Sequence, residues 1–297
     1  MEDLKEKRKG EVYIFFEVLL WALFPIITTL TYIGLPAMLS FAWSVTFSAI
    51  FFGCIVLYRK TWIEIKNPEL WKYIFFITLF IAILFYGFYF IGLSKTTPGN
   101  AALIGQFEIC TSFLFFHLFR KDHISKEYIV GAFLMLVGAL IVLAPNISGI
   151  NIGDFLVLAA TFCTPIGNHF QRKARKIASS ETIMFLRTTL SIPVIFLFAY
   201  IIGTRSSFFD IKSSLPFLIV NGMLLLGLSK ILWIEGIHRM PVMKANALGS
   251  IGPLLTLLLA WVLLRQIPTA WQLVSLPPLI FGTLFLTDQI GFHRKNP

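Results

Sequence analysis

Charged residues are scarce in this chain of 297 residues: 13% are charged, whereas 57% are hydrophobic. A soluble globular domain carries about 25% charged residues, so this chain has too little polar material to cover a water-exposed surface. Its mean hydropathy is +0.80, and phenylalanine alone numbers 31. The composition therefore indicates a protein whose solvent is a lipid membrane.

Cysteine and the common cofactor motifs are scarce or absent as well. Cys54, Cys110 and Cys163 lie in apolar runs far apart in the sequence, without the spacing of a disulfide framework or a metal site. The chain has no G-x-x-x-x-G-K-[ST], no H-E-x-x-H and no G-x-S-x-G. We therefore expect no ATP site, no metal and no other cofactor, and we find no motif that favours an enzyme.

Long apolar runs take the place of these motifs. A membrane-spanning helix needs about 20 predominantly apolar residues, and none of the runs alternates as barrel strands do. The sequence thus predicts an all-α integral membrane protein with ten transmembrane helices and short tails at 1–11 and 289–297. We expect the first run to be a span, because it is too long for a signal peptide. The predicted spans are 12–31, 37–58, 71–93, 98–119, 127–145, 153–171, 182–203, 215–237, 242–264 and 268–288.

The net charge of +10 is unevenly distributed over the predicted loops. Of the 25 lysines and arginines, 19 fall in the segments on the side of the N-terminus and four in those on the other side. The positive-inside rule then places both termini in the cytoplasm and the chain in the cell's inner membrane. Anionic lipid, and not nucleic acid, is the expected partner of this charge.

The two halves of the chain, 12–145 and 153–288, resemble each other. "GLSKTTPGNAALIGQFEICTSFLFF" from Gly92 aligns with "GIHRMPVMKANALGSIGPLLTLLLA" from Gly236 at an offset of 144. The pairs Ala101/Gly105 and Ala245/Gly249 are spaced to let helices approach closely. Five spans per half is an odd number, so the second half is expected to be inverted in the membrane. Inverted repeats are typical of secondary transporters, whose substrate site lies near the midplane.

Two prolines occupy corresponding positions in the first and sixth spans. Pro25 and Pro165 each lie about a dozen residues into their span, where proline removes a helical hydrogen bond. Polar residues follow both, namely Thr28 in the first span and Asn168 and His169 in the sixth. This pattern predicts helix interruptions beside a substrate site, with simple packing kinks as the alternative.

Three stretches carry a resemblance to a known family. They are "NAALIGQFEICTSFLFFHLFRKDHISKEYIVGAFLMLVGALIVL", its counterpart "KANALGSIGPLLTLLLAWVLLRQIPTAWQLVSLPPLIFGTLFL", and "GDFLVLAATFCTPIGNHFQRKARK". Together they resemble the drug/metabolite transporter superfamily, specifically its EamA-type members. The resemblance implies ten spans and a small-molecule substrate such as an amino acid, nucleoside, sugar or drug, often exported. A Glu-Pro pair frequent in spans 4 and 9 of the family is split here, because Glu108 keeps the acid and Pro253 the proline. An arginine frequent in span 7 matches Arg187.

Two ionisable residues lie deep in apolar runs. Glu108 is ten residues past Pro98, about 15 Å deep at 1.5 Å per residue, and Lys230 is about 22 Å from the outer end of its span. An unpaired charge there is costly, so we expect the two side chains to pair, with a proton or substrate able to break the pair. The alternatives are a structural acid bonded to a neighbouring helix and a lysine that reaches the interface.

The remaining candidates are shallower or aromatic. Arg187 and Glu17 lie about five residues into their spans and are expected to reach an interface. Tyr86 and Tyr89 share a helix face and predict an aromatic belt at the membrane surface. The alternative is the wall of a binding cavity, and Trp233, which occupies the repeat position of Tyr89, keeps that alternative open.

The patterns together favour a secondary active transporter that moves a small metabolite or drug-like solute by alternating access. The family resemblance implies export, with proton coupling as an option through Glu108; an uptake permease of the same fold is the first alternative. A membrane-embedded enzyme and a receptor without flux are alternatives of other classes. Lys230 and Arg187 suit a carboxylate or phosphate and Glu108 an amine, while the oligomeric state stays open.

Overall fold

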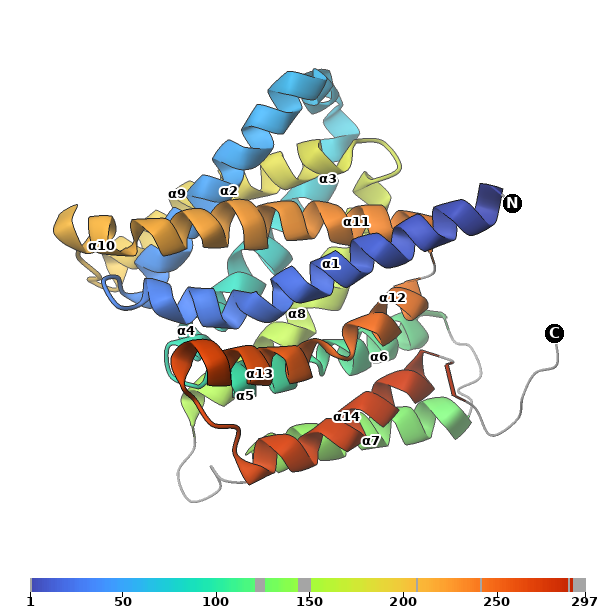
Figure 1. The fold of residues 1–297 in the computed structure, drawn as a ribbon. Coiled ribbons are helices and arrows are strands. Elements are labelled where there is room, and N and C mark those ends of the chain that lie inside the picture. Colours follow the sequence, from blue (N-terminus) through green and yellow to red (C-terminus); the bar gives the residue numbers. More distant parts are fainter. Residues whose placement is uncertain are drawn as a thin grey trace.

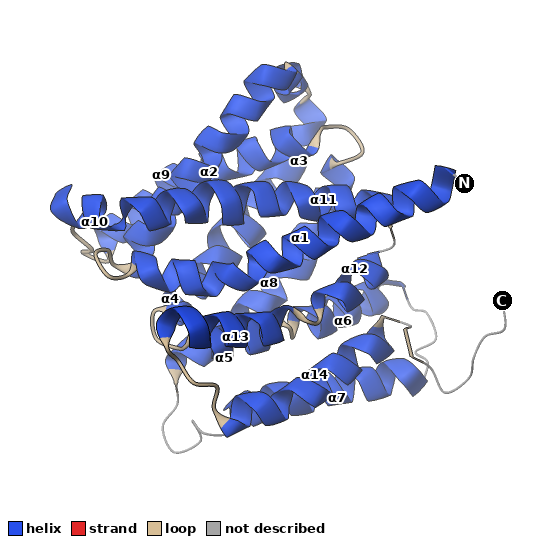
Figure 2. Ribbon diagram, viewed as in Figure 1, coloured by secondary structure: helices blue, strands red, loops and turns tan. Residues whose placement is uncertain are grey.

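The computed structural model describes residues 2–120, 126–143, 151–206, 208–240, 242–287 and 289–290. Within them the chain forms helices joined by loops, without any strand (Figure 2). The all-helical prediction is therefore confirmed. The predicted ends of the fifth span at 145 and of the tenth at 288, and nearly all of the C-terminal tail, lie outside the described residues.

The first repeat contains five spans, two of which are composite. The third span joins α3, a π-helical segment η2 and α4, and the fourth joins α5 and α6. A 3₁₀ helix, η1, precedes the third span. The elements are α1 (Glu2–Thr31), α2 (Ala37–Arg59), η1 (Thr61–Lys66), α3 (Pro68–Ile77), η2 (Thr78–Phe85), α4 (Tyr86–Leu93), α5 (Pro98–Gly105), α6 (Glu108–Arg120) and α7 (Lys126–Leu143).

The second repeat follows the same plan, including its irregular parts. Adding 144 to the bounds of α5 gives those of α12, and α13 begins 144 residues after α6. A second π-helical segment, η4, interrupts the eighth span. The elements are α8 (Ile152–Ala174), α9 (Ser180–Ile201), α10 (Phe208–Ile219), η4 (Val220–Leu228), α11 (Ser229–Arg239), α12 (Val242–Gly249), α13 (Gly252–Leu264) and α14 (Ala270–Leu286).

The helix interruptions predicted at Pro25 and Pro165 are wrong. Both prolines lie inside continuous helices, α1 and α8, because a single lost hydrogen bond does not end a helix that is packed on both sides. The Thr29 hydroxyl also donates to the Pro25 carbonyl at 2.9 Å. The matched interruptions are instead the π segments of spans 3 and 8 and the breaks of spans 4 and 9, which follow Gly105 and Gly249. Glycine favours a break, since it has poor helix propensity.

Six helical stretches in the described part of the chain are long and apolar enough to cross a membrane. The two halves of span 4 and of span 9 are each too short to qualify alone, because a break divides them. The helices α13 and α14 are apolar but shorter. Spans 4 and 9, which the apolar runs predicted as continuous helices, are therefore each divided into two shorter helices.

Helices of one repeat pack against helices of the other in reciprocal pairs. The first span, α1, packs on α11 of the eighth, and its counterpart α8 packs on α4 of the third. Likewise α1 contacts α13, while α8 contacts α6. Counterparts also pack on each other, α2 on α9 and α7 on α14, the latter pair lying side by side at the bottom of Figure 1. This reciprocity is what a two-fold relation between the repeats requires.

Glycines bring the paired helices close together. These are not Gly105 and Gly249, the glycines of the pairs that the sequence pointed to. A Cβ on Gly92 would lie 2.8 Å from the Gly153 carbonyl oxygen, where α4 meets α8. In the corresponding α1–α11 contact, a Cβ on Gly10 would lie 3.3 Å from the Gly236 oxygen. A Cβ on Gly249 would meet no described heavy atom within 4 Å. The expectation that Gly249 allows a close helix contact is therefore wrong, since it lies where span 9 breaks.

Gly282 provides a test of this packing. Its Cβ in Gly282→Ala would lie 2.8 Å from the Met135 backbone nitrogen and 2.9 Å from the Gly131 oxygen of α7, so the helices must move apart. We expect a loss of about 1–3 kcal/mol in unfolding free energy, measured by thermal unfolding in detergent. Gly87→Ala is the control, because that Cβ meets nothing within 4 Å. Equal effects of the two substitutions would contradict the close α7–α14 contact.

Candidate functional site

Four ionisable side chains meet inside the helix bundle, and we call them the charge cluster: Glu17, Glu108, Arg187 and Lys230. Lys230 is close enough to the other three to interact electrostatically with each of them. Glu17 on α1 and Arg187 on α9 are each 4% exposed, and the Lys230 side chain on α11 is 16% exposed. The cluster thus brings together groups separated by up to 213 residues in the sequence.

Lys230 forms its ion pair with Glu17. The Nζ atom donates to Glu17 Oε1 at 3.5 Å and lies 3.3 Å from the centre of the Trp21 ring, a cation–π contact. The Ser229 hydroxyl also donates to Glu17 Oε1, at 3.3 Å. The predicted Glu108–Lys230 pair is therefore not the one that this structure shows. The expectation that Glu17 reaches an interface is also wrong, because α1 begins at Glu2 and places Glu17 midway along its thirty residues.

Glu108 lies at the first residue of α6, beyond the break in span 4. The chain turns at Gln106 and Phe107, and the Phe107 amide donates to the Ile104 carbonyl at 3.0 Å. The dipole of a helix stabilises a negative charge at its N-terminus. The Glu108 side chain is partly exposed and interacts with Thr164 of α8, Lys230 and Glu17. Of the two acids in the cluster, Glu108 is therefore the more exposed one.

Arg187 is buried in the interior and does not reach an interface. Its Nε atom has no hydrogen-bond partner, and the Tyr86 hydroxyl is its hydrogen-bonding neighbour. Its position in the fold explains this burial, since α9 packs along α2 and against η2. The interfacial location expected from the shallow sequence position of Arg187 is wrong, because helix packing encloses this end of the span.

Tyr86 and Tyr89 also point into the protein. Each is 5% exposed, and both contact the ring of Phe24, which is fully buried. The aromatic-belt prediction is therefore wrong for these two residues, and the alternative location beside an interior site fits. Tyr86 interacts with Arg187, Glu108 and Glu17, so it borders the charge cluster.

Thr28 forms a buried polar contact with Asn221, a residue that is not among the candidates from the sequence. The Asn221 amide donates to the Thr28 hydroxyl at 3.1 Å and to the Ser44 hydroxyl at 3.2 Å. Thr28, Ser44 and Asn221 are fully buried and come from α1, α2 and η4. A single asparagine in the apolar run "LIVNGMLLLG" was the available signal, because a lone amide in such a run needs partners.

The other three candidates have different surroundings. His169 contacts the rings of Phe115 and Phe170, and Asn168 beside it on α8 is partly buried. Trp233 packs on apolar clusters that include Ile14 and Phe52. The structure therefore gives His169 and Trp233 packing contacts of their own and places Trp233 on α11 one turn beyond Lys230.

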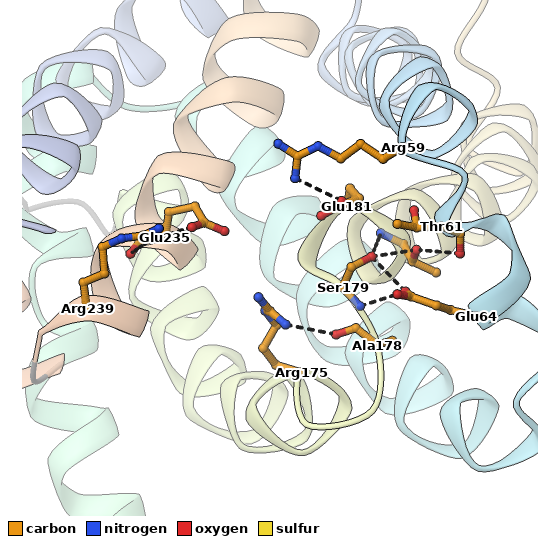
Figure 3. Close-up of polar contacts among 10 residues, drawn as sticks. Arg59, Thr61, Glu64, Arg175, Ala178, Ser179, Glu181, Glu235 and Arg239 are labelled. Atoms are coloured by element: carbon orange, nitrogen blue, oxygen red, sulfur yellow. Dashed lines mark hydrogen bonds and ion pairs between the residues drawn. The ribbon is translucent and has the colours of Figure 1, made fainter. Parts of the chain in front are cut away.

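Polar contacts close the boundary between the repeats at the N-terminal end of α9. Glu64 of η1 accepts hydrogen bonds from the Ser179 amide and hydroxyl, both at 2.8 Å (Figure 3). Arg59 at the end of α2 pairs with Glu181 at 3.2 Å (Figure 3). Both contacts join the first repeat to the second. We call this set the α9 network.

A second set of contacts joins the repeats near the start of α8, and we call it the α8 network. Thr96 donates a hydrogen bond to Asp154, and the Asn100 amide reaches the same carboxylate at 3.5 Å. Gln272 of α14 donates to the Asn100 side chain at 2.7 Å. The α9 and α8 networks lie at opposite ends of the repeat boundary, since one joins the C-terminal end of α2 and the other the end of α4.

Comparison with known proteins agrees with this architecture. A crystal structure described only as "Crystal structure of protein" superimposes with a TM-score of 0.67 and 18% identity, covering 93% of this chain and 95% of the other, which shows the fold alone. "Uncharacterized transporter sll1164" of Synechocystis sp. (strain ATCC 27184 / PCC 6803 / Kazusa) is 22% identical over 250 residues, 77% of this chain and 70% of that protein. "Uncharacterized transporter YyaM" of Bacillus subtilis (strain 168) is 20% identical over 225 residues, which cover 71% of this chain and 72% of that protein.

The family model agrees with the two repeats seen in the helices. The model described as the EamA-like transporter family matches twice, at residues 8–144 and 151–288. The two matches cover the helices of the first and second repeats in turn and together span nearly the whole chain. This chain therefore belongs to the EamA-like transporter family and is a multi-pass membrane transporter.

Proposed function

We propose that the protein is a secondary active transporter that exports a small solute across the inner membrane by alternating access, coupled to protons through Glu108. The termini are proposed to be cytoplasmic, and the repeats to be inverted. Export is the direction that the family resemblance implies, with uptake through the same site as the alternative. The proposed transport mechanism requires neither a nucleotide nor a metal.

The observation that carries the proposal is the division of the charge cluster between the repeats. Both acids, Glu17 and Glu108, come from the first repeat, and both bases, Arg187 and Lys230, come from the second. A movement of one repeat against the other therefore changes the distances between opposite charges. Because such charges are costly inside a membrane, their pairing is coupled to the position of the repeats, as alternating access requires.

In the proposed mechanism, the α9 network and the α8 network close the two ends of the repeat boundary and open in turn. In this structure the α9 network ties η1 and α2 to α9, while the α8 network ties α5 and the loop before it to α8 and α14. In the proposed mechanism, the charge cluster lies between the two networks. Opening one network at a time would expose the cluster to one side of the membrane, and few hydrogen bonds need to break at each end.

Two acids compete for the one positive charge of Lys230, and this competition is the basis of the proposed proton coupling. Lys230 can be neutralised by Glu17 or by Glu108, and both acids interact with it. When Lys230 pairs with Glu17, the charge of Glu108 is best neutralised by a proton or by a cationic group of the solute. Competition between those two for Glu108 is the simplest form of proton–solute antiport.

The test is flux in proteoliposomes that contain the purified protein. A panel of small amino acids, organic acids, amines, nucleosides and sugars is measured with an imposed pH gradient, with empty liposomes as the control. We expect at least one solute to move against its own gradient at the expense of the proton gradient. Binding without flux would indicate a receptor, and a chemically altered solute would indicate an enzyme; either result would overturn the proposal.

A further inference from the structure

Arg187 is a buried cation that forms no ion pair with a described carboxylate. The Arg187 side chain is 4% exposed, and its Nε atom has no hydrogen-bond partner. Among the residues that the structure describes, no carboxylate forms an ion pair with it. Lys230, in contrast, is held by Glu17 and Trp21. The two bases of the charge cluster are therefore in different electrostatic situations.

A small cavity adjoins this guanidinium group. Its volume is about 10 Å³, which is room for about one water molecule. The lining residues come from α2, η2, α4, α9 and η4: Val45, Ser48, Ala82, Tyr86, Arg187, Thr188 and Leu226. The cavity thus lies on the boundary between the repeats, where a movement of either one would enlarge it.

Two hydroxyl groups beside the cavity, those of Ser48 and Thr188, already have acceptors, whereas Arg187 has an unused donor. Ser48 donates to the Leu226 carbonyl at 3.3 Å, and Thr188 donates to the Met184 carbonyl at 2.8 Å. The guanidinium group carries five N–H donors in a plane, and its Nε–H is unused. A planar fork of this kind suits a carboxylate, whose two oxygens accept in parallel.

We propose that Arg187 is the docking group for a carboxylate of the transported solute, which makes the substrate a small organic acid or an amino acid. The inference rests on the proposed transport function and names the substrate class of that site. The carboxylate enters the cavity as a movement of the repeats enlarges it, and accepts hydrogen bonds from Nε and a terminal nitrogen of Arg187. An amine on the same solute lies toward Glu108, the acid that has no ion pair with Lys230 in this structure.

The test uses solutes that share a carbon skeleton but differ in charge. Leucine, 4-methylpentanoate and 3-methylbutylamine form one set, and phenylalanine, 3-phenylpropanoate and 2-phenylethylamine a second. Exchange in proteoliposomes and thermal stabilisation in detergent are both measured for wild type, Arg187→Gln, Arg187→Lys and the control Arg205→Gln. Arg205 is exposed and lies outside the described helices.

We expect acids and amino acids to exchange and to stabilise the wild-type protein, and the simple amines to do neither. Arg187→Gln should weaken their binding by about tenfold to a hundredfold, the value of charge-assisted hydrogen bonds. Arg187→Lys should retain part of the affinity, and Arg205→Gln all of it. If Arg187→Gln does not fold, Arg187→Lys carries the comparison.

Two results would overturn the assignment of Arg187. One is exchange confined to amines, and the other is acid binding that is the same in wild type and Arg187→Gln. Failure of the transport proposal has a different signature, namely acids that stabilise the protein in detergent, through Arg187, without any exchange in proteoliposomes. That result would support carboxylate docking while refuting transport.

Discussion

Glu108→Gln is expected to abolish flux driven by a pH gradient while exchange of solute across the membrane continues. Glutamine keeps the size and the hydrogen-bonding capacity of the side chain but can neither bind nor release a proton. The partly exposed position of Glu108 at the start of α6 and its interactions with Lys230 and Glu17 make it the acid best placed to exchange a proton. Gradient-driven flux should fall at least about a hundredfold, the lower end of the range typical of a lost proton-transfer group.

The matched control for this experiment is Glu69→Gln. Glu69 is an exposed acid at the start of α3, outside the charge cluster, so its replacement should leave both gradient-driven flux and exchange unchanged. Gradient-driven flux that persists in Glu108→Gln would refute proton coupling through this residue. Loss of exchange together with gradient-driven flux would instead make Glu108 part of solute binding.

Breaking the Glu17–Lys230 pair is expected to destabilise the protein more than removing it altogether. Glu17→Gln or Lys230→Met leaves one buried charge without its partner, which costs on the order of 3–5 kcal/mol. The double variant leaves neither charge, and methionine preserves an apolar contact with Trp21. Its loss should therefore be clearly smaller than the sum of the single losses, by a double-mutant cycle of thermal unfolding in detergent.

Surface charges provide the comparison for this cycle. Lys9 pairs with Glu6 at 2.6 Å, with side chains 60% and 43% exposed, and Lys9→Met should leave the melting temperature unchanged because water screens such pairs. Additive losses in Glu17→Gln and Lys230→Met would contradict the pairing. Exchange measured for the same variants would then tell whether the double variant, although stable, has lost solute movement, as expected for a cluster that serves transport.

The sequence predicted the depth of Glu108 and Lys230, but neither the burial of Glu17 and Arg187 nor the pairing within the charge cluster. Glu108, Arg187 and Lys230 stand out because charge is rare in apolar runs. Depth along a span is a one-dimensional estimate, and it favoured Glu108 as the partner of Lys230. The rotation of α1 and α11 about their axes decides instead that Glu17 faces Lys230. Asn221 was overlooked because its partners, Thr28 and Ser44, lie far away in sequence.

The aromatic and proline predictions failed for a related reason. Aromatic residues near the end of a span favour an interfacial belt, yet Tyr86 and Tyr89 lie on the face of α4 that packs against Phe24. Proline in a span favours an interruption, yet α1 and α8 continue past Pro25 and Pro165. In both cases the packing of neighbouring helices outweighs the local preference.

Composition and the length of the apolar runs are enough to predict the class of the fold, because the hydrophobic effect acts on both. The sequence also predicts the two repeats, since the offset of 144 is present in the residues. The breaks in spans 4 and 9, the pairing of helices, and the meeting of two acids and two bases at one interior site became known from the three-dimensional packing. Those features depend on contacts between segments far apart in the chain, and no local pattern specifies the angle at which a helix faces its neighbours.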